Sequence, residues 1–109
     1  MTEAEEKRIE KELKAFLDGE KRLIALPAKY KKQLLGFWWI ASQLPEDGVW
    51  NERELNAALN AWHTFGDPAL IRRTLVDLGV LDRDPRGTRY TLRQPMPTLN
   101  EFLASGLNQ

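Results

Sequence analysis

The stretch DPALIRRTLVDLGVLDRDPRGTRYTL, residues 67–92, indicates the fold because it combines one helix with one hairpin. An Asp-Pro pair is typical of a helix start, and a glycine is typical of the residue that follows a helix. Beyond that glycine, two strand-like runs flank a turn that contains proline and glycine. The sequence therefore predicts a helix over 68–78 and a β-hairpin over 80–92.

Two further helices are predicted upstream of this stretch. The helix over 29–44 has apolar residues on more than one face, which is typical of a central helix. After a strand stub at 49–50, Asn51 and Glu54 form a capping box that begins a helix over 52–63. The order of helix, stub, two helices and hairpin is typical of a winged helix-turn-helix, in which the stub pairs with the wing.

Each end of the chain adds one helix. Residues 1–18 have the spacing of an amphipathic helix, and a short helix is predicted at 98–106. The winged-helix core then spans 27–93, and a chain of 109 residues leaves no room for a second domain. We expect a single domain over 1–109, mainly α with a small β-hairpin.

Composition argues against a membrane protein. The 16 basic and 16 acidic residues balance, and 42% hydrophobic with 29% charged residues is ordinary for a soluble globular protein. The longest uncharged run, 33–45, is shorter than the roughly 20 residues that a membrane-spanning helix needs. Because the acidic N-terminus is not a signal peptide, we expect a cytoplasmic protein with no membrane partner.

The sequence also argues against an enzyme. It has no cysteine and one histidine, which excludes a thiolate metal site and a histidine cluster, so we expect no metal and no cofactor. Neither a carboxylate pair nor a glycine-rich phosphate loop is in a plausible setting. His63 lies near a predicted helix end, where we expect it to cap that helix.

Arginines suggest a contact with nucleic acid. Residues 67–93 hold six arginines against four aspartates. Arg72 and Arg73 are predicted on the outward face of the 68–78 helix, and Arg83, Arg86 and Arg89 on the wing, where planar guanidinium groups suit phosphates and guanine edges. The alternative is that Arg72 and Arg73 form surface ion pairs with Asp77 and Asp67.

A second basic group lies at the start of the central helix. In a helix-turn-helix unit, the first helix crosses the DNA backbone, which suits Lys29, Lys31 and Lys32 as phosphate contacts. A solvated helix start is the alternative reading of these lysines. The predicted DNA-binding residues are Arg72, Arg73, Arg86, Arg89, Lys29, Lys31 and Lys32.

Four tryptophans, at 38, 39, 50 and 62, are best explained as core residues. Trp38 and Trp39 lie about 100° apart on a helix, so both are buried only if two sides of that helix are covered. Of the four tryptophans, Trp39 is therefore the one predicted to mark a surface that binds a partner.

Three segments carry a resemblance to a known family. They are LPAKYKKQLL at 26–35, WNERELNAALNAWH at 50–63 and DPALIRRTLVDLGVLDRDPRGTRY at 67–90. Over about residues 16–92 the chain resembles a bacterial domain of unknown function, number 2087. The resemblance implies a winged-helix-like fold and a cytoplasmic role linked to small transcription regulators, and it implies no established activity.

Two functions remain open from the sequence. The first is a winged-helix module of bacterial transcriptional regulation that binds duplex DNA through residues 68–78 and the wing. The alternative is a protein-interaction or dimerisation winged helix without DNA binding, in which the N-terminal helix contacts a second copy or a regulator protein. The outward arginines favour the first function, and the near-neutral pI of 6.6 favours the second. A small-molecule sensor has only the tryptophan count in its favour.

Overall fold

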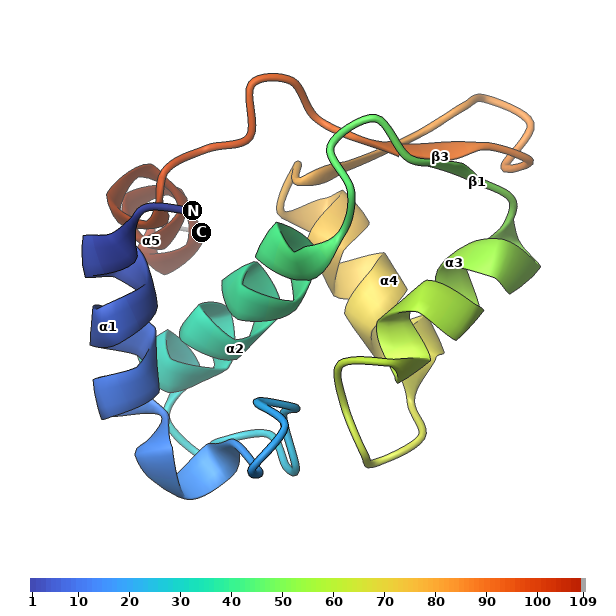
Figure 1. The fold of residues 1–109 in the computed structure, drawn as a ribbon. Helices are drawn as coiled ribbons and strands as arrows, with labels where there is room; N and C mark the ends of the chain where they lie inside the picture. Colours follow the sequence, from blue (N-terminus) through green and yellow to red (C-terminus); the bar gives the residue numbers. More distant parts are fainter. Residues whose placement is uncertain (109) are drawn as a thin grey trace.

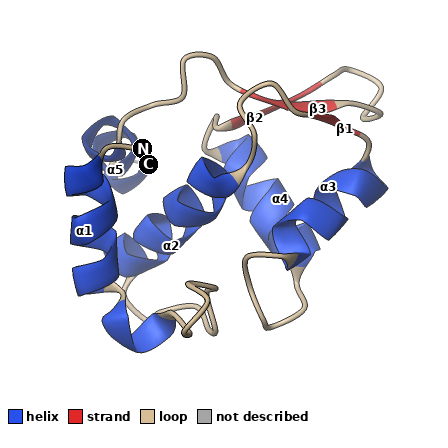
Figure 2. Cartoon of the chain, in the orientation of Figure 1, coloured by secondary structure: helices blue, strands red, loops and turns tan. Residues whose placement is uncertain are grey.

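The computed structural model describes residues 1–108, which form a helical assembly with one small sheet (Figures 1 and 2). In this range there are five α-helices, one short 3-10 helix and three strands. The helices are α1 (Glu3–Glu12), η1 (Lys14–Phe16), α2 (Tyr30–Gln43), α3 (Glu52–Asn60), α4 (Pro68–Asp77) and α5 (Leu99–Leu107). The strands are β1 (Val49–Trp50), β2 (Leu81–Arg83) and β3 (Tyr90–Leu92).

Local side-chain caps determine where four of the helices begin. In α1, α3 and α5, a Thr or Asn side chain accepts a hydrogen bond from the amide three residues on, and the glutamate there accepts one in return. In α4, Asp67 accepts from the amide of Leu70, and Pro68 occupies the first helical position. The capping pairs are Thr2–Glu5, Asn51–Glu54 and Thr98–Glu101.

The three strands form one antiparallel sheet in the order β1-β3-β2. Two residues of β3 have a partner on both sides: Tyr90 lies opposite Trp50 and Arg83, and Thr91 lies opposite Val49 and Asp82. The predicted pairing of the strand stub with the hairpin is confirmed.

The central helix is α2, in which residues 34–41 are all buried. Figure 1 shows α1 and α5 on one side of α2 and α4 on the other, and each of these three helices contacts it. Leu23 also packs closely on α2, since a Cβ added to Gly36 would lie 3.1 Å from Leu23 Cδ2. The expected position of this helix at the centre of the core is therefore confirmed.

Two predicted helices are shorter in the structure. The helix predicted over 1–18 ends at Glu12, because the chain turns so that Leu17 pairs with Leu23 and the amide of Ile24 donates to the carbonyl of Phe16 at 2.9 Å. The helix predicted over 52–63 ends at Asn60.

The same segment explains the early end of α3. The amide of Leu23 donates to the carbonyl of Trp62 at 2.9 Å, and the amide of Thr64 donates to the carbonyl of Leu23 at 3.0 Å. These hydrogen bonds require an extended backbone after α3. Helices α2, α4 and α5 agree with their predicted ranges to within one residue at each end.

None of the helices in residues 1–108 has both the length and the hydrophobicity that a membrane crossing requires.

Candidate nucleic-acid interface

His63 connects α3 to α4. Its Nδ1 lies 2.8 Å from the carbonyl oxygen of Leu59, and its Nε2 lies 3.0 Å from the amide nitrogen of Asp67. A neutral ring that carries its proton on Nδ1 satisfies both contacts, donating to Leu59 and accepting from Asp67. The side chain is buried, with its ring edge-on to Phe65. The predicted role of His63 as a cap at the end of α3 is confirmed. The same ring also holds Asp67, the residue that precedes α4.

Arg72 does not face solvent, so its predicted outward orientation is wrong. Its side chain is 16% exposed, and its Nη2 lies 3.0 Å from Oε1 of Glu52 at the start of α3. Its Nη1 donates to Oδ1 of Asn56 on the same helix. The side of α4 that carries Arg72 therefore faces α3, and the guanidinium group links the two helices. The alternative pairing with Asp67 or Asp77 is also absent from residues 1–108.

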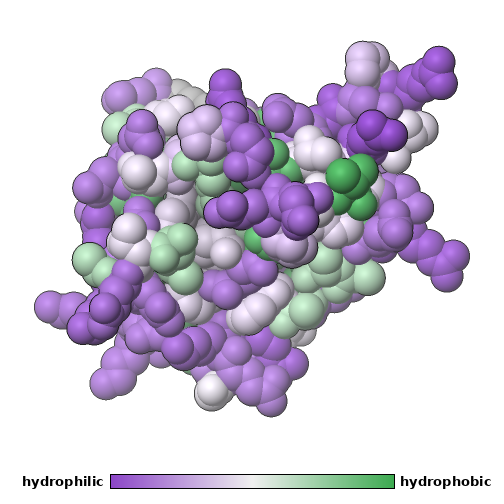
Figure 3. Space-filling view, turned by 45° about the horizontal axis from the view of Figure 1, so that its top comes forward, coloured by the Kyte–Doolittle hydropathy of each residue, from purple (hydrophilic) through white to green (hydrophobic). Residues whose placement is uncertain are grey.

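The remaining arginines of α4, the hairpin and the residue after it are exposed. None of them forms an ion pair with any residue in the part of the chain that the structure describes. Figure 3 shows that hydrophilic residues cover most of the face that lies at the top of Figure 1, where the sheet is. These arginines are Arg73, Arg83, Arg86, Arg89 and Arg93.

Basic residues near the N-terminus behave differently. Arg8 pairs with Glu12 at 2.9 Å, and Arg22 pairs with Asp18 at 2.8 Å. Lys21 pairs with two glutamates of α1. These three residues are thus neutralised by neighbours, unlike the arginines of the hairpin; among the other described basic residues, Lys11, Lys14, Lys29, Lys31, Lys32 and Arg53 also lack an ion pair.

Asp84 organises the hairpin turn. Its carboxylate accepts hydrogen bonds from the amide of Thr88 at 2.7 Å, the hydroxyl of Thr88 at 2.8 Å and the amide of Arg89 at 3.0 Å. The amide of Arg89 and the side chain of Thr88 hold the pKa of Asp84 below its ordinary value. Within residues 1–108 the carboxylate forms no ion pair with the arginines of the hairpin, but its negative charge interacts with the positive charge of Arg89. Asp77 and Asp82 are exposed nearby and lower the local positive charge.

The three predicted lysines lie at the start of α2. Lys29 and Lys31 are exposed and Lys32 is half-buried. The start of α2 is the end farther from the strands, since a helix of 14 residues is about 21 Å long and its other end leads to β1 (Figure 1). The structure therefore does not bring these lysines together with the arginines of the hairpin.

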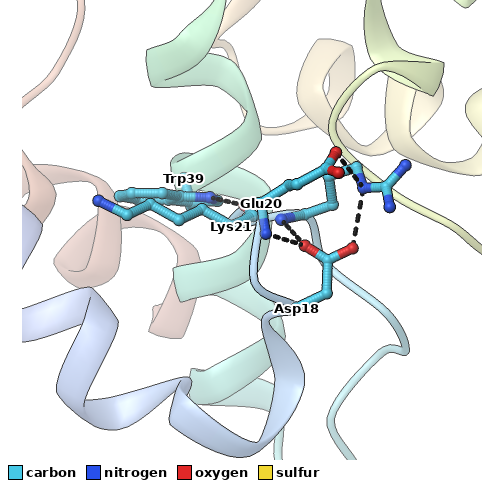
Figure 4. Close-up of polar contacts among 5 residues, drawn as sticks. Asp18, Glu20, Lys21 and Trp39 are labelled. Carbon is cyan, nitrogen blue, oxygen red and sulfur yellow. Dashed lines mark hydrogen bonds and ion pairs between the residues drawn. The ribbon is translucent and has the colours of Figure 1, made fainter.

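Trp39 is a core residue, so the prediction that it marks a partner surface is wrong. It is 2% exposed, and its Nε1 donates to the carbonyl of Lys21 at 2.9 Å. Figure 4 shows this contact beside the turn in which Asp18 accepts from the amides of Glu20 and Arg22. The segment before α2 thus covers the side of the helix that we expected to be open.

Lys21 is held at this turn by its side chain as well. Its Nζ lies 2.6 Å from Oε1 of Glu10 and 3.4 Å from Oε1 of Glu6, both on α1. Hydrogen bonding to Glu10 and then to Glu6 raises the pKa of Lys21. Its backbone has a φ of 64°, which is uncommon for a residue with a side chain. The contacts to α1 and Trp39 keep Lys21 in this conformation.

The other tryptophans support the core prediction. Trp38 is 2% exposed, and its Nε1 donates to the carbonyl of Pro97 at 3.1 Å. Trp50 and Trp62 are partly buried against the core. Trp38 and Trp39 are both buried because α2 is covered on two sides, as their spacing requires.

Sequence reasoning placed Arg83 on the wing but missed its neighbours. Its guanidinium carbon lies 6.0 Å from the centroid of the Tyr90 ring, directly across the hairpin register. The signal was present in the alternation of the two strand-like runs, which would have aligned Arg83 with Tyr90. The roles of Glu52 and Asn56 as partners of Arg72 have no signal in the local sequence.

No group of three or more histidine, cysteine, aspartate or glutamate side chains in residues 1–108 is arranged to hold a metal ion. The chemistry that this surface offers is instead electrostatic, from exposed guanidinium groups on a helix and an adjoining hairpin.

The fold and this surface define a small helical domain with a three-stranded antiparallel sheet and a basic hairpin. The chain belongs to the bacterial family described as "Uncharacterized protein conserved in bacteria", DUF2087, whose model matches residues 22–92. The match includes every element from α2 to β3 and leaves α1 and α5 outside it. The resemblance seen in the sequence is confirmed. No curated protein and no solved structure matches the chain.

Proposed function

We propose that this chain is a winged helix-turn-helix domain of bacterial transcriptional regulation that binds duplex DNA through α4 and the β2–β3 hairpin. The order α2, β1, α3, α4, β2, β3 and the sheet order β1-β3-β2 support the winged-helix assignment. In such a domain, α4 is the helix that enters the major groove, and the hairpin is the wing.

The observation that carries the proposal is the set of exposed arginines without acidic partners. Arg73 lies on α4, and Arg83, Arg86 and Arg89 lie on the hairpin. Guanidinium groups bind phosphate oxygens through two parallel hydrogen bonds, and DNA backbone contacts supply much of the affinity of such domains. Arg72 is excluded from this set because its Nη1 already binds Asn56, its Nη2 binds Glu52, and its charge is paired.

Binding of a labelled random-sequence duplex, followed by fluorescence anisotropy over a salt series, tests the proposal. Four phosphate contacts give a log–log slope of binding constant against salt of about −3 to −4. Arg73→Glu combined with Arg86→Glu should abolish binding, because both side chains are exposed and face the proposed DNA. The matched control is Lys11→Glu combined with Lys14→Glu, which changes the net charge equally at two exposed positions near α1.

The proposal fails if the unmodified protein does not bind duplex at about 50 mM salt and about 1 mM protein, roughly 100-fold above a non-specific constant of ~10⁻⁵ M. It also fails if the control pair weakens binding as much as the Arg73 and Arg86 pair. Equal losses would indicate a response to net charge rather than a defined surface.

The second candidate is a protein-interaction or dimerisation module. The formal net charge of zero and the exposed Asp77 and Asp82 beside the arginines favour a partner with mixed charge. The structure argues against α1 as the contact, because Ile9 and Leu13 are fully buried against the same chain. Sedimentation equilibrium together with the duplex assay tests this candidate, since DNA-binding winged helices are also commonly dimers. A stable dimer that binds no duplex supports it, and a monomer at micromolar concentration contradicts its dimerisation form.

A further inference from the structure

A pocket of about 300 Å³ lies between α4, the start of α3 and the hairpin. Three arginines line it, Arg72 and Arg73 from α4 and Arg83 from β2. Tyr90 of β3 also lines the pocket, and the guanidinium carbons of Arg72 and Arg83 each lie 6.0 Å from the centroid of its ring. The pocket therefore brings together cationic groups from two elements of the proposed DNA-binding surface.

The charges in this pocket are not balanced. Glu52 and Asp77 are the carboxylates that line it, and Glu52 is already paired with Arg72 at 3.0 Å. Asp77 forms no ion pair with another residue in the described range, and neither Arg73 nor Arg83 has an acidic partner there. The three arginines and two carboxylates leave the pocket with one positive charge in excess, which suits one anionic group.

Arg83 is held in position by packing rather than by an acidic partner. Its guanidinium lies against Gly87, since a Cβ built at that position would come within 2.8 Å of the Arg83 Nε. Tyr90, which is 2% exposed, lies opposite Arg83 on β3. A guanidinium group that is already placed loses little freedom when it binds a ligand, and its donors are not used by a carboxylate.

We propose that this pocket binds one phosphate group, with Arg83 and Arg73 as its direct ligands and Arg72 as a fixed positive support. The planar fork of arginine matches the oxygens of a phosphate. The volume is at the lower end of the range for small-molecule pockets, which fits a phosphate with an adjoining sugar. Two sources share this chemistry: a backbone phosphate of DNA, which rests on the proposed function, and a free phosphomonoester, which does not.

Titration with inorganic phosphate at constant ionic strength, with chloride as the reference anion, tests the pocket. The side-chain Nε–H signals of the arginines, observed by ¹⁵N NMR, report on each guanidinium group. We expect saturable shifts at Arg73 and Arg83. Arg83→Gln should weaken phosphate binding about tenfold or more, because it removes charged hydrogen bonds. The matched control, Arg53→Gln, removes an exposed arginine of α3 that neither lines the pocket nor belongs to the proposed DNA-binding set, and it should leave phosphate binding unchanged.

Three results would overturn the proposal: no shift with phosphate, shifts of equal size at all exposed arginines, or local binding that survives Arg83→Gln. Because this titration contains no DNA, it tests whether the pocket binds phosphate even if the protein binds no duplex. The duplex assay then identifies the source. If the source is DNA, Arg83→Gln reduces the salt slope by about 1. If the source is a free phosphomonoester, a 5′-mononucleotide competes with inorganic phosphate, and Arg83→Gln changes the duplex affinity no more than the control does.

Discussion

The carboxylate of Glu5 accepts a hydrogen bond from the backbone amide of Leu99 at 2.8 Å, across 94 positions of sequence. Its other oxygen accepts from the amide of Thr2, also at 2.8 Å. One side chain therefore caps the starts of both α1 and α5. Arg8 reinforces this link, since its Nη1 donates to Oδ1 of Asn100 at 2.9 Å.

This double cap makes stability depend on acidity. Burial raises the pKa of Glu5, but the amides of Thr2 and Leu99 outweigh that effect and hold the pKa below its ordinary value of 4.5. A carboxyl whose pKa is lower in the folded state stabilises the fold above its unfolded pKa, and this contribution is lost as pH falls through the folded pKa. The free energy of unfolding should therefore decrease as the pH falls below 4.5.

Glu5→Gln should lower the free energy of unfolding at neutral pH by about 1 kcal/mol, because an amide has one acceptor oxygen where the carboxylate has two. It should also flatten the loss of stability in acid. Urea denaturation at neutral and acidic pH measures both effects. Glu3→Gln is the control, since it removes a charge from the same helix turn at an exposed position. A parallel acid dependence in Glu5→Gln and the unmodified protein would contradict the prediction.

His63→Ala should destabilise the helix pair α3 and α4. The amide of Asp67 loses its acceptor, whereas the carbonyl of Leu59 keeps the amide of Trp62 as a donor. Leaving one part-buried amide without a partner costs about 1–3 kcal/mol, to which the loss of a buried ring adds. Urea denaturation measures the change, and Asn60→Ala, at an exposed position nearby, is the control. An unchanged midpoint for His63→Ala would show that the ring does not hold the two helices.

Arg72 and Arg73 are adjacent but should differ in their effects on folding. Arg72→Ala should cost about 1–2 kcal/mol because it removes hydrogen bonds to Glu52 and Asn56 from a mostly buried side chain. Arg73→Ala should stay within about 0.5 kcal/mol of the unmodified protein, as is usual for an exposed side chain. Thermal unfolding of the two variants compares them directly. Equal stability of both would refute the structural role of Arg72.

Leu75→Ala should remove about 2–5 kcal/mol through lost burial and a cavity, because Leu75 is fully buried on α4. The control on the same helix is Ala69→Ser, an exposed position where about 0.5 kcal/mol or less is expected. The midpoint of chemical denaturation measures the difference. A Leu75→Ala variant as stable as the control would place α4 outside the core.

Helix starts were predictable because their causes are local. In the capping pairs Thr2–Glu5 and Asn51–Glu54, the two partners are three positions apart, so a short stretch of sequence contains both partners of each capping hydrogen bond. The ends of α2, α4 and α5 were predicted to within one residue, whereas the ends of α1 and α3 depended on distant contacts. α1 and α3 both stop early because the segment around Leu23 forms backbone hydrogen bonds after each of them, and no local pattern indicates that pairing.

The candidate site divides in the same way. Periodicity placed Arg73 on the outer face of its helix, and turn residues placed Arg86 in the hairpin. The role of Arg72 could not be predicted, because it depends on how the start of α3 docks against α4. Trp39 was misplaced for a similar reason, since its partner is a backbone carbonyl in a turn with an uncommon φ.

The small sheet has two edge strands, β1 and β2, and their short length limits which strands of another molecule can pair with them. β1 consists of two residues and is followed at once by the cap of α3, while the other outer strand, β2, carries exposed Asp82 and Arg83. An exposed edge recruits strands from other molecules when it is long, flat and apolar. These edges are short and one is charged, so the hairpin can project into solvent without becoming a template for aggregation.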